Sequence, residues 1–441
     1  MERINAVLDT INGVVWGWPM IFLLFGTHLF LTIRLAGIQR HVFYGIKLSL
    51  QRKKEGVGDI SQFGALTTAL AATVGTGNIA GVATAIAAGG PGAVFWMWLT
   101  GVFGIATKYA EGLLSVKYRI VTSDGSLAGG PMYVLERGLK CRPLGVLFAL
   151  LTAIAAFGIG NTVQSHSVAT LVHETFHLAP WITGLVLTML TALVILGGIS
   201  SIARTCERLV PFMAIFYVLG CFVLLIIFRE KVLPAVQLIL SSALNGHAAA
   251  GGFLGAGVRE SVRFGIARGL FSNESGMGSA PIVAAAAQTK NPVRQALVSA
   301  TGTFWDTVVI CAITGITIVA SGEWVNGLSG VALSKAAFSH LSNFGPCYLT
   351  VGLFTFVFST ILGWSYYGEK AVEYLFGKKS IRPYRYLWVA GVMVGSVVNP
   401  AVWSFADIAN ALMTLPNLIS LVLLSTVAAK ETREYFSGPE R

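Results

Sequence analysis

The stretch "ATVGTGNIAG", residues 72–81, places glycines, threonine hydroxyls and an asparagine amide inside a strongly apolar part of the chain. Glycine lets a backbone approach a ligand closely. The N–H groups at the start of a half-helix suit a carboxylate, whereas unwound carbonyls and hydroxyls suit a hard cation such as sodium. The pattern indicates reversible binding of such groups, and close helix packing through small residues is the competing interpretation.

A second stretch, "LFSNESGMGSAP" at residues 270–281, is built in the same way, with Gly276, Gly278 and a terminal Pro281. Interrupted helices at membrane depth need partners that hydrocarbon cannot supply. A pair of them at matching positions in two halves of a chain is typical of the binding site of a secondary transporter. The acid Glu274 lies in this second stretch, where it either organises the unwound backbone or helps an ion or a gate.

The elements that must position these stretches are membrane helices. Of the 441 residues, 54% are hydrophobic and 12% are charged, and the mean hydropathy is +0.71. These values predict an all-α polytopic membrane protein that forms a single membrane transport domain, residues 1–441. Three shorter segments, residues 41–54, 234–246 and 333–341, are expected to lie at the membrane interface. The apolar windows predict eleven spans, at about 15–35, 63–87, 92–118, 145–170, 181–200, 209–228, 255–288, 296–320, 345–369, 384–402 and 405–428.

The two polar stretches fall in the second and the seventh of these spans. Equivalent positions are therefore five spans apart, and an odd number of spans inverts the topology. This predicts a first repeat at residues 63–228 and an inverted second repeat at residues 255–428, preceded by an extra N-terminal helix at residues 15–35.

The charged residues bear on topology and on the classes of function. Most of the 31 lysines and arginines fall on alternate loops, which predicts an N-terminus outside and a C-terminus in the cytoplasm. Because these residues are scattered, a nucleic-acid partner is not expected. Lys108 and Glu111 are three residues apart on one span, which predicts an ion pair. No catalytic motif or metal-type cysteine spacing is visible, so we expect neither an enzyme nor a cofactor. A channel would need a continuous polar pore.

Four blocks of the sequence resemble a known family. "GGPGAVFWMWLTGVFG" (residues 89–104), "ATVGTGNIAG", "SNESGMGSAP" and "GWSYYGEK" (residues 363–370) are similar to conserved blocks of the sodium:alanine symporter family, also called alanine or glycine:cation symporters. The resemblance implies a LeuT-type fold with a five-plus-five inverted repeat, in the cell (inner) membrane. It also implies sodium-coupled import of alanine or glycine, with D-alanine as a further candidate. Import of glutamine, or coupling to protons, stays open as an alternative, and an ion channel is the alternative of another class.

The resemblance also implies a sodium site. Its ligands would be the carbonyls of Ala71, Val74 and Phe356 and the hydroxyls of Ser359 and Thr360. Oxygen ligands suit this cation. The competing interpretation is that the two hydroxyls bond to their own helix.

For the amino acid, the resemblance points to both breaks and to two further spans. Gln164 shares a helical face with Asn161 and Ser165, which indicates either a polar cavity or an interhelical hydrogen bond. Trp364 would limit the pocket, Met277 would fill the pocket wall or the core, and Asp306 would support a gate or bond to a neighbouring hydroxyl. The sequence does not fix the oligomeric state. The predicted substrate-binding residues are Thr76, Gly77, Asn78, Gln164, Ser275, Gly276, Met277, Gly278 and Trp364.

Overall fold

The computed structural model describes residues 10–51, 56–244, 257–398 and 402–438. Residues 255, 256 and 399–401 of the second predicted repeat lie outside these ranges, as do residues 52–54 and 245–246 of the predicted interfacial segments and the basic residue 441. Within them, almost every element is a helix. The helices before the second break are α2 (Trp18–Arg34), α3 (Val42–Ser49), α4 (Gln62–Thr73), α5 (Val82–Gly89), α6 (Gly92–Lys117), α7 (Pro131–Tyr133), α8 (Arg142–Phe157), α9 (Val163–Phe176), α10 (Pro180–Ile195), α11 (Gly198–Ile227), α12 (Arg229–Leu244) and α13 (Val258–Asn273).

The helices after the second break are α14 (Pro281–Ala284), α15 (Pro292–Thr303), α16 (Ala312–Ser321), α17 (Gly330–Phe338), α18 (Gly345–Phe376), α19 (Ile381–Val397), α20 (Val402–Leu423) and α21 (Ser425–Ser437). Wider, π-helical turns occur at η2 (Gly77–Gly81), η3 (Val134–Gly138), η4 (Gly158–Thr162) and η5 (Phe304–Cys311), and 3₁₀ turns at η1 (Ile38–His41), η6 (Glu323–Asn326), η7 (Ser339–Phe344) and η8 (Lys378–Ser380). One short antiparallel hairpin pairs β1 (Ile120–Val121) with β2 (Leu127–Ala128).

Within the described residues, the predicted spans overlap with helices or with consecutive helices that breaks and turns separate. Six stretches in the described part of the chain are long and apolar enough to cross a membrane. A seventh is added if α4 and the η2–α5 helix, which meet at an angle of 52°, are counted as one span. The all-α membrane architecture is confirmed, whereas the count of eleven spans and the inverted repeat stay predictions. The six stretches are Thr10–Arg34, Arg142–Phe176, Gly198–Ile227, Pro292–Ser321, Gly330–Phe376 and Phe405–Leu423.

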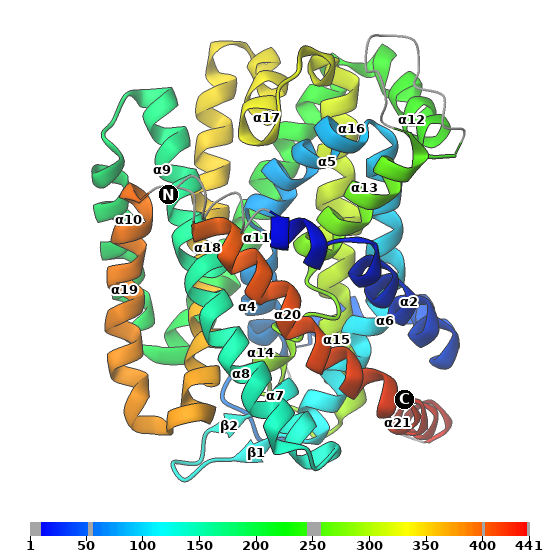
Figure 1. Ribbon diagram of the computed structural model, residues 1–441, viewed down its shortest axis with the longest axis vertical. Helices are drawn as coiled ribbons and strands as arrows, with labels where there is room; N and C mark the ends of the chain where they lie inside the picture. The colour runs from blue at the N-terminus through cyan, green and yellow to red at the C-terminus, as the bar shows by residue number, and fades with distance from the viewer. Residues whose placement is uncertain (1–9, 52–55, 245–256, 399–401, 439–441) are drawn as a thin grey trace.

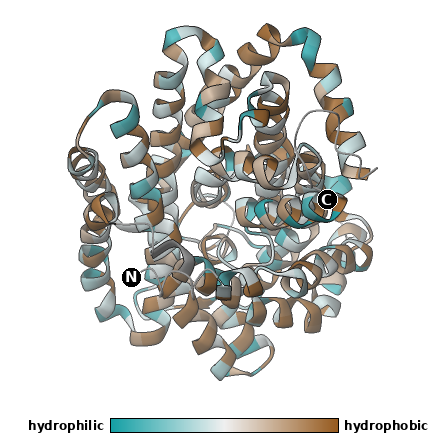
Figure 2. Cartoon of the chain, turned by 45° about the horizontal axis from the view of Figure 1, so that its top comes forward, coloured by the Kyte–Doolittle hydropathy of each residue, from teal (hydrophilic) through white to brown (hydrophobic). Residues whose placement is uncertain are grey.

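Apolar side chains cover the outside of the molecule as well as its interior. Ile33, Leu193, Ile215 and Leu387 are exposed on α2, α10, α11 and α19, and brown, hydrophobic positions recur along the peripheral helices in Figure 2. An outward apolar surface of this extent suits contact with lipid.

The two breaks lie in the middle of the molecule. In Figure 1, α5 and α13 rise toward the upper end, whereas α4 and α14 descend toward the lower end that carries the hairpin. The long helix α6 packs against α13 and α15, and α18 packs against α4, α8 and α11. Two unbroken helices, α6 and α18, therefore support the two broken ones.

Candidate functional site

The first break follows Thr73, where the backbone leaves the helix. Val74 adopts an extended conformation, with φ −76° and ψ 93°. The side-chain oxygen of Asn78 accepts a hydrogen bond from the Gly75 N–H at 2.9 Å, which replaces a helical acceptor. The Asn78 Nδ2 donates to Asp306 Oδ1 on η5 at 2.8 Å. Asn78 thus fixes the shape of the break and ties it to a second element.

Asp306 is fully buried and accepts from three neutral groups. Besides Asn78, the hydroxyl of Ser272 donates to Oδ2 at 2.9 Å and the hydroxyl of Thr307 donates at 2.7 Å. Ser272 belongs to the last turn of α13, so this carboxyl group joins the first break to the helix that enters the second. Asp306 therefore contacts neighbouring hydroxyls, as one predicted alternative had it, and also supports the first break.

A cluster of oxygen atoms lies between the end of α4 and the middle of α18. Ser359 Oγ is 3.2 Å from the Ala71 carbonyl oxygen and 2.8 Å from that of Phe356. Thr360 Oγ1 is 3.0 Å from the same Phe356 oxygen. The two hydroxyls donate to their own helix, as the competing interpretation predicts, yet Ser359 also reaches across to α4. Four of the five predicted sodium ligands are brought together.

Gly75 lies directly against this cluster. A Cβ atom at Gly75 would be 2.5 Å from Thr360 Oγ1. Any side chain at this position would therefore displace the Thr360 hydroxyl. The carbonyl of the preceding Val74 is the fifth predicted ligand, and no hydrogen bond among the described residues joins that oxygen to the cluster. The donors are neutral oxygens that come from carbonyls and hydroxyls, a set that fits a weakly held sodium ion.

Gln164 presents an acceptor beside the same glycine. Its Nε2 donates to the Ile159 carbonyl at 2.9 Å, whereas its Oε1 is buried and has no hydrogen-bond partner among the described residues. This oxygen is 3.7 Å from the place where a Cβ on Gly75 would lie. A buried acceptor without a partner is costly unless a ligand supplies a donor. The ammonium group of a bound amino acid would supply this donor.

The second break is held by protein groups. Glu274, Gly276 and Gly278 have φ values of 53°, 91° and 84°, so the chain turns repeatedly through the left-handed region. The Oε1 atom of Glu111, on α6, accepts from the N–H groups of Gly276 and Gly278, each at 3.0 Å. Asn417 on α20 donates to the same oxygen at 2.7 Å. A resident carboxylate therefore occupies the place that an anionic ligand would take.

The other residues predicted in this break point to different neighbours. Ser275 Oγ is 3.0 Å from Thr303 Oγ1 on α15. Met277 is completely buried, and its sulfur is 3.5 Å from Asn410 Nδ2. The assignment of residues 275–278 to the substrate therefore stays a prediction, with their amides and side chains engaged within the protein in this conformation.

Glu274 connects the second break to Trp364. The indole Nε1 of Trp364 donates to Glu274 Oε1 at 3.0 Å, and the Ser279 hydroxyl donates to the other carboxyl oxygen. A Cβ at Gly160 would overlap the Cβ of Trp364, so η4 approaches this side chain closely. Trp364 is thus a buried and fixed wall between the second break and η4.

The predicted ion pair between Lys108 and Glu111 is wrong. Glu111 turns to the second break, and the Lys108 ammonium has no hydrogen-bond or ion-pair partner in the described part of the chain. It lines a small cavity with Thr73 and Asn273. The three-residue spacing favours a local ion pair, but the sequence does not show that the fold brings two glycine amides to the Glu111 carboxylate.

The model of the sodium:alanine symporter family matches residues 1–440. The chain belongs to the sodium:alanine symporter family. The sodium/alanine symporter AgcS of Methanococcus maripaludis is 50% identical over 442 residues, which cover 98% of this chain and 97% of that protein. The probable sodium/glutamine symporter GlnT of Bacillus subtilis is 37% identical over 444 residues, covering 98% and 91% of the two chains.

A solved structure agrees with the fold. The crystal structure of MhsT in complex with L-phenylalanine superposes with a TM-score of 0.62 at 15% identity, covering 86% of this chain and 93% of that one. At that identity the likeness shows the fold alone, which is LeuT-like. The protein is a multi-pass membrane transporter of the sodium:alanine symporter family.

In this symporter-family protein, one arginine joins the lower ends of the two broken helices. The guanidinium of Arg119 donates to the carbonyls of Ala285, Ala287, Val57 and Thr289 at 2.8–3.1 Å. These carbonyls belong to the segment before α4 and the segment after α14. Sequence reasoning missed Arg119, because nothing in the spacing of the residues shows which loops meet.

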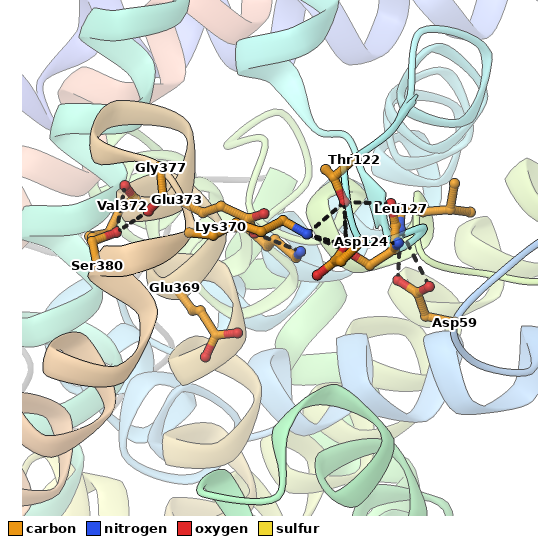
Figure 3. Close-up of polar contacts among 12 residues, drawn as sticks. Asp59, Thr122, Asp124, Leu127, Glu369, Lys370, Val372, Glu373, Gly377 and Ser380 are labelled. Atoms are coloured by element: carbon orange, nitrogen blue, oxygen red, sulfur yellow. Dashed lines mark hydrogen bonds and ion pairs between the residues drawn. The ribbon is translucent and has the colours of Figure 1, made fainter.

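A second group of contacts closes the same end, as Figure 3 shows for Asp59, the hairpin and the end of α18. Asp59 accepts from the Leu127 N–H at 3.0 Å, Asp124 pairs with Lys378, and Lys370 pairs with Glu373 at 2.7 Å. Burial raises the pKa of the Asp59 carboxyl, and its hydrogen bond from Leu127 acts in the opposite direction. The lower end of the molecule is therefore closed by ionic and backbone contacts together.

Proposed function

We propose that the protein is a sodium-coupled symporter that imports alanine and glycine by alternating access. The observation that carries this is the cluster of Ala71, Phe356, Ser359 and Thr360 oxygens beside Gly75 and the unpartnered Gln164 Oε1. It supplies neutral oxygens for a cation and an acceptor for an ammonium group within the same few ångströms.

In this proposal each part of the first break has one task. The Ala71, Val74 and Phe356 carbonyls and the Ser359 and Thr360 hydroxyls bind sodium, which orders the unwound segment. The N–H groups at the start of η2, at Thr76 and Gly77, receive the carboxylate of the amino acid. Gln164 Oε1 accepts from its ammonium group.

The cycle then needs two gates and a driving force. The Arg119 contacts hold the end of the molecule that carries the hairpin closed, and their release would open the path on that side. We assign this end to the cytoplasm of a cell (inner) membrane, with the N-terminus outside, because the basic loops gather there. The membrane potential contributes about 2.3 kcal/mol per charge per 100 mV to sodium entry.

The fixed position of Trp364 supports small substrates. Trp364 is fixed by Glu274 and pressed against Gly160, which leaves it little freedom to make room for a long side chain. This supports alanine, glycine and D-alanine over glutamine. Glutamine stays the alternative, since GlnT, named a probable sodium/glutamine symporter, is a relative. Competition between labelled alanine and unlabelled glutamine would separate the two.

The test is uptake of radiolabelled alanine into proteoliposomes under an inward sodium gradient, compared with potassium alone and with a proton gradient. Thr360→Val removes a hydroxyl of the oxygen cluster at nearly constant shape. Thr355→Val on the same helix is the matched control, because the Thr355 hydroxyl donates to the Gly352 carbonyl at 2.8 Å. We expect sodium-driven, saturable uptake that Thr360→Val weakens and Thr355→Val preserves. Equal uptake with a proton gradient would remove the sodium assignment, and no uptake of alanine, glycine or glutamine would overturn the function.

A further inference from the structure

A basic cavity lies far from the two breaks, between the end of α2, the η1 turn and the C-terminal helix α21. It has a volume of about 210 Å³ and opens to solvent. The charged and aromatic side chains that line it are Arg34, Arg40, His41, Arg433 and Phe436.

Among the described residues, no carboxylate neutralises the positive charge of this cavity. None of the described residues that line it is acidic. The two acids of the adjoining helix are engaged elsewhere, because Glu431 pairs with Lys117 at 2.6 Å and Glu434 lies 3.8 Å from Lys430. Arg34 donates to a neutral acceptor, a threonine hydroxyl at 2.8 Å, and forms no ion pair with a described residue. Three guanidinium groups thus face one space that receives no carboxylate from the described part of the chain.

The cavity lies where two membrane spans end. The candidate span Thr10–Arg34 stops at the cavity, and the candidate span Phe405–Leu423 leads directly into α21. Figure 1 shows the end of α2 close to α21 at the lower right. The helix ends place this cavity at the level of the lipid headgroups, whichever side of the membrane it faces.

A sharp turn of the backbone after α2 directs Arg40 and His41 toward this cavity. Ala36 and Gly37 have φ values of 52° and 68°. Two consecutive left-handed residues reverse the chain after the span, and a non-glycine residue in this region is uncommon. The reversal brings η1, with Arg40 and His41, back beside α21, where the His41 ring stacks on Phe436 with centroids 4.3 Å apart.

We propose that this cavity binds the phosphate headgroup of an anionic phospholipid. Arginine forks match phosphate oxygens in a bidentate way, and basic pockets beside membrane helices are suited to such headgroups. The stacked His41 and Phe436 rings form an apolar floor for the glycerol backbone. The extra N-terminal helix and α21 thereby form a lipid-binding platform, independent of the site proposed for sodium and the amino acid.

The experiment titrates the purified full-length protein in neutral detergent with short-chain phosphatidylglycerol, and follows the thermal unfolding midpoint. Phosphatidylcholine of the same chain length and inorganic phosphate are the two other arms. We expect a saturable rise with phosphatidylglycerol, a much smaller one with phosphatidylcholine, and none with inorganic phosphate at the same concentration. A free phosphate that reproduces the full rise would overturn the assignment to lipid.

Substitutions of the cavity arginines test whether phosphatidylglycerol binds in this cavity. In Arg40→Gln/Arg433→Gln the apparent affinity for phosphatidylglycerol should fall roughly 30-fold, since each arginine near anionic lipid contributes about 1 kcal/mol. Arg433→Gln alone should lose roughly fivefold, which keeps the test available if the double variant is poorly folded. Lys430→Gln, on the same helix and outside the cavity, is the matched control and should bind like wild type. Undiminished binding by Arg433→Gln and the double variant, or an equal loss in Lys430→Gln, would contradict the proposal.

Discussion

The two helix breaks occupy matching places in the chain but are completed in opposite ways. At the first break, oxygens of Ala71, Ser359 and Thr360 gather beside Gly75, and Gln164 Oε1 has no partner among the described residues. At the second break, the amides of Gly276 and Gly278 already have an acceptor in Glu111. The first break presents acceptors that a ligand can use, whereas the glycine amides of the second break are satisfied by the protein itself.

This difference indicates that the second break has a structural role and that the first break binds the ligands. A break whose amides are bound by a resident carboxylate is a rigid joint, because any movement must carry Glu111 and α6 with it. A break that is held mainly through Asn78 and Asp306 can respond to a cation and an amino acid. Ser272, near the end of α13, donates to Asp306 and so joins the first break to the helix that enters the second.

The largest effect is expected from Glu111→Ala, which removes the carboxylate of the second break. Two buried amides and the Asn417 side chain would lose their common acceptor, and each buried unsatisfied group costs about 1–3 kcal/mol. Sodium-driven alanine uptake should be lost and the thermal unfolding midpoint should fall. Glu111→Gln keeps one oxygen in place and should recover part of both. Normal uptake by Glu111→Ala would mean that the second break does not need its carboxylate.

The next largest effect is expected at one of the two glycines of the first break, Gly75. Gly75→Ala puts a Cβ 2.5 Å from Thr360 Oγ1, so the hydroxyl must rotate away from the oxygen cluster. The sodium concentration for half-maximal uptake should rise at least about tenfold, equivalent to about 1.4 kcal/mol. Gly77→Ala is the matched control, since its Cβ would meet Ser272 at ordinary distances of 3.4–3.6 Å. Equal behaviour of the two variants would place the ion elsewhere.

The sequence was sufficient for the helices and for the positions of both breaks. Long apolar windows and glycine-rich interruptions are local properties, so α6, α18 and the breaks at residues 74–78 and 274–280 could be predicted from composition and spacing. The resemblance to the family supplied what spacing does not contain, namely that residues 71 and 359 meet across α4 and α18.

The partners of the buried charges could not be predicted in the same way. Glu111 was visible as an acid in an apolar span, but its acceptors and donors depend on how α6, α13 and α20 pack. Its nearest opposite charge in sequence, Lys108, was a misleading guide, because a carboxylate in a membrane protein binds whichever donors the fold brings closest. Arg119 was hidden for a similar reason, since its four acceptors are main-chain carbonyls.

A moderate effect is expected from Gln164→Leu, which removes the unpartnered acceptor at nearly constant volume. If this oxygen binds the ammonium group, the KM for alanine should rise roughly 5–30-fold, which corresponds to about 1–2 kcal/mol. The maximal rate and the sodium dependence should change little, as for a loss of uniform binding. Ser167→Ala on the same helix is the control, because its hydroxyl donates to the Val163 carbonyl. An unchanged KM would remove Gln164 from the substrate site.

The smallest effect is expected from Glu274→Gln. This variant tests directly whether the second break, unlike the first, binds no ligand. A glutamine oxygen can still accept from Trp364 Nε1, and its amide can donate to the Ser279 hydroxyl, so both contacts of Glu274 survive without the charge. If the second break is only a joint, alanine uptake should fall less than about fivefold, the scale of one weakened hydrogen bond. Its dependence on sodium, measured as the Hill coefficient and the half-saturating concentration, should stay as in wild type. A lower Hill coefficient would show that the Glu274 charge acts on a cation, in which case the second break binds a ligand as the first does.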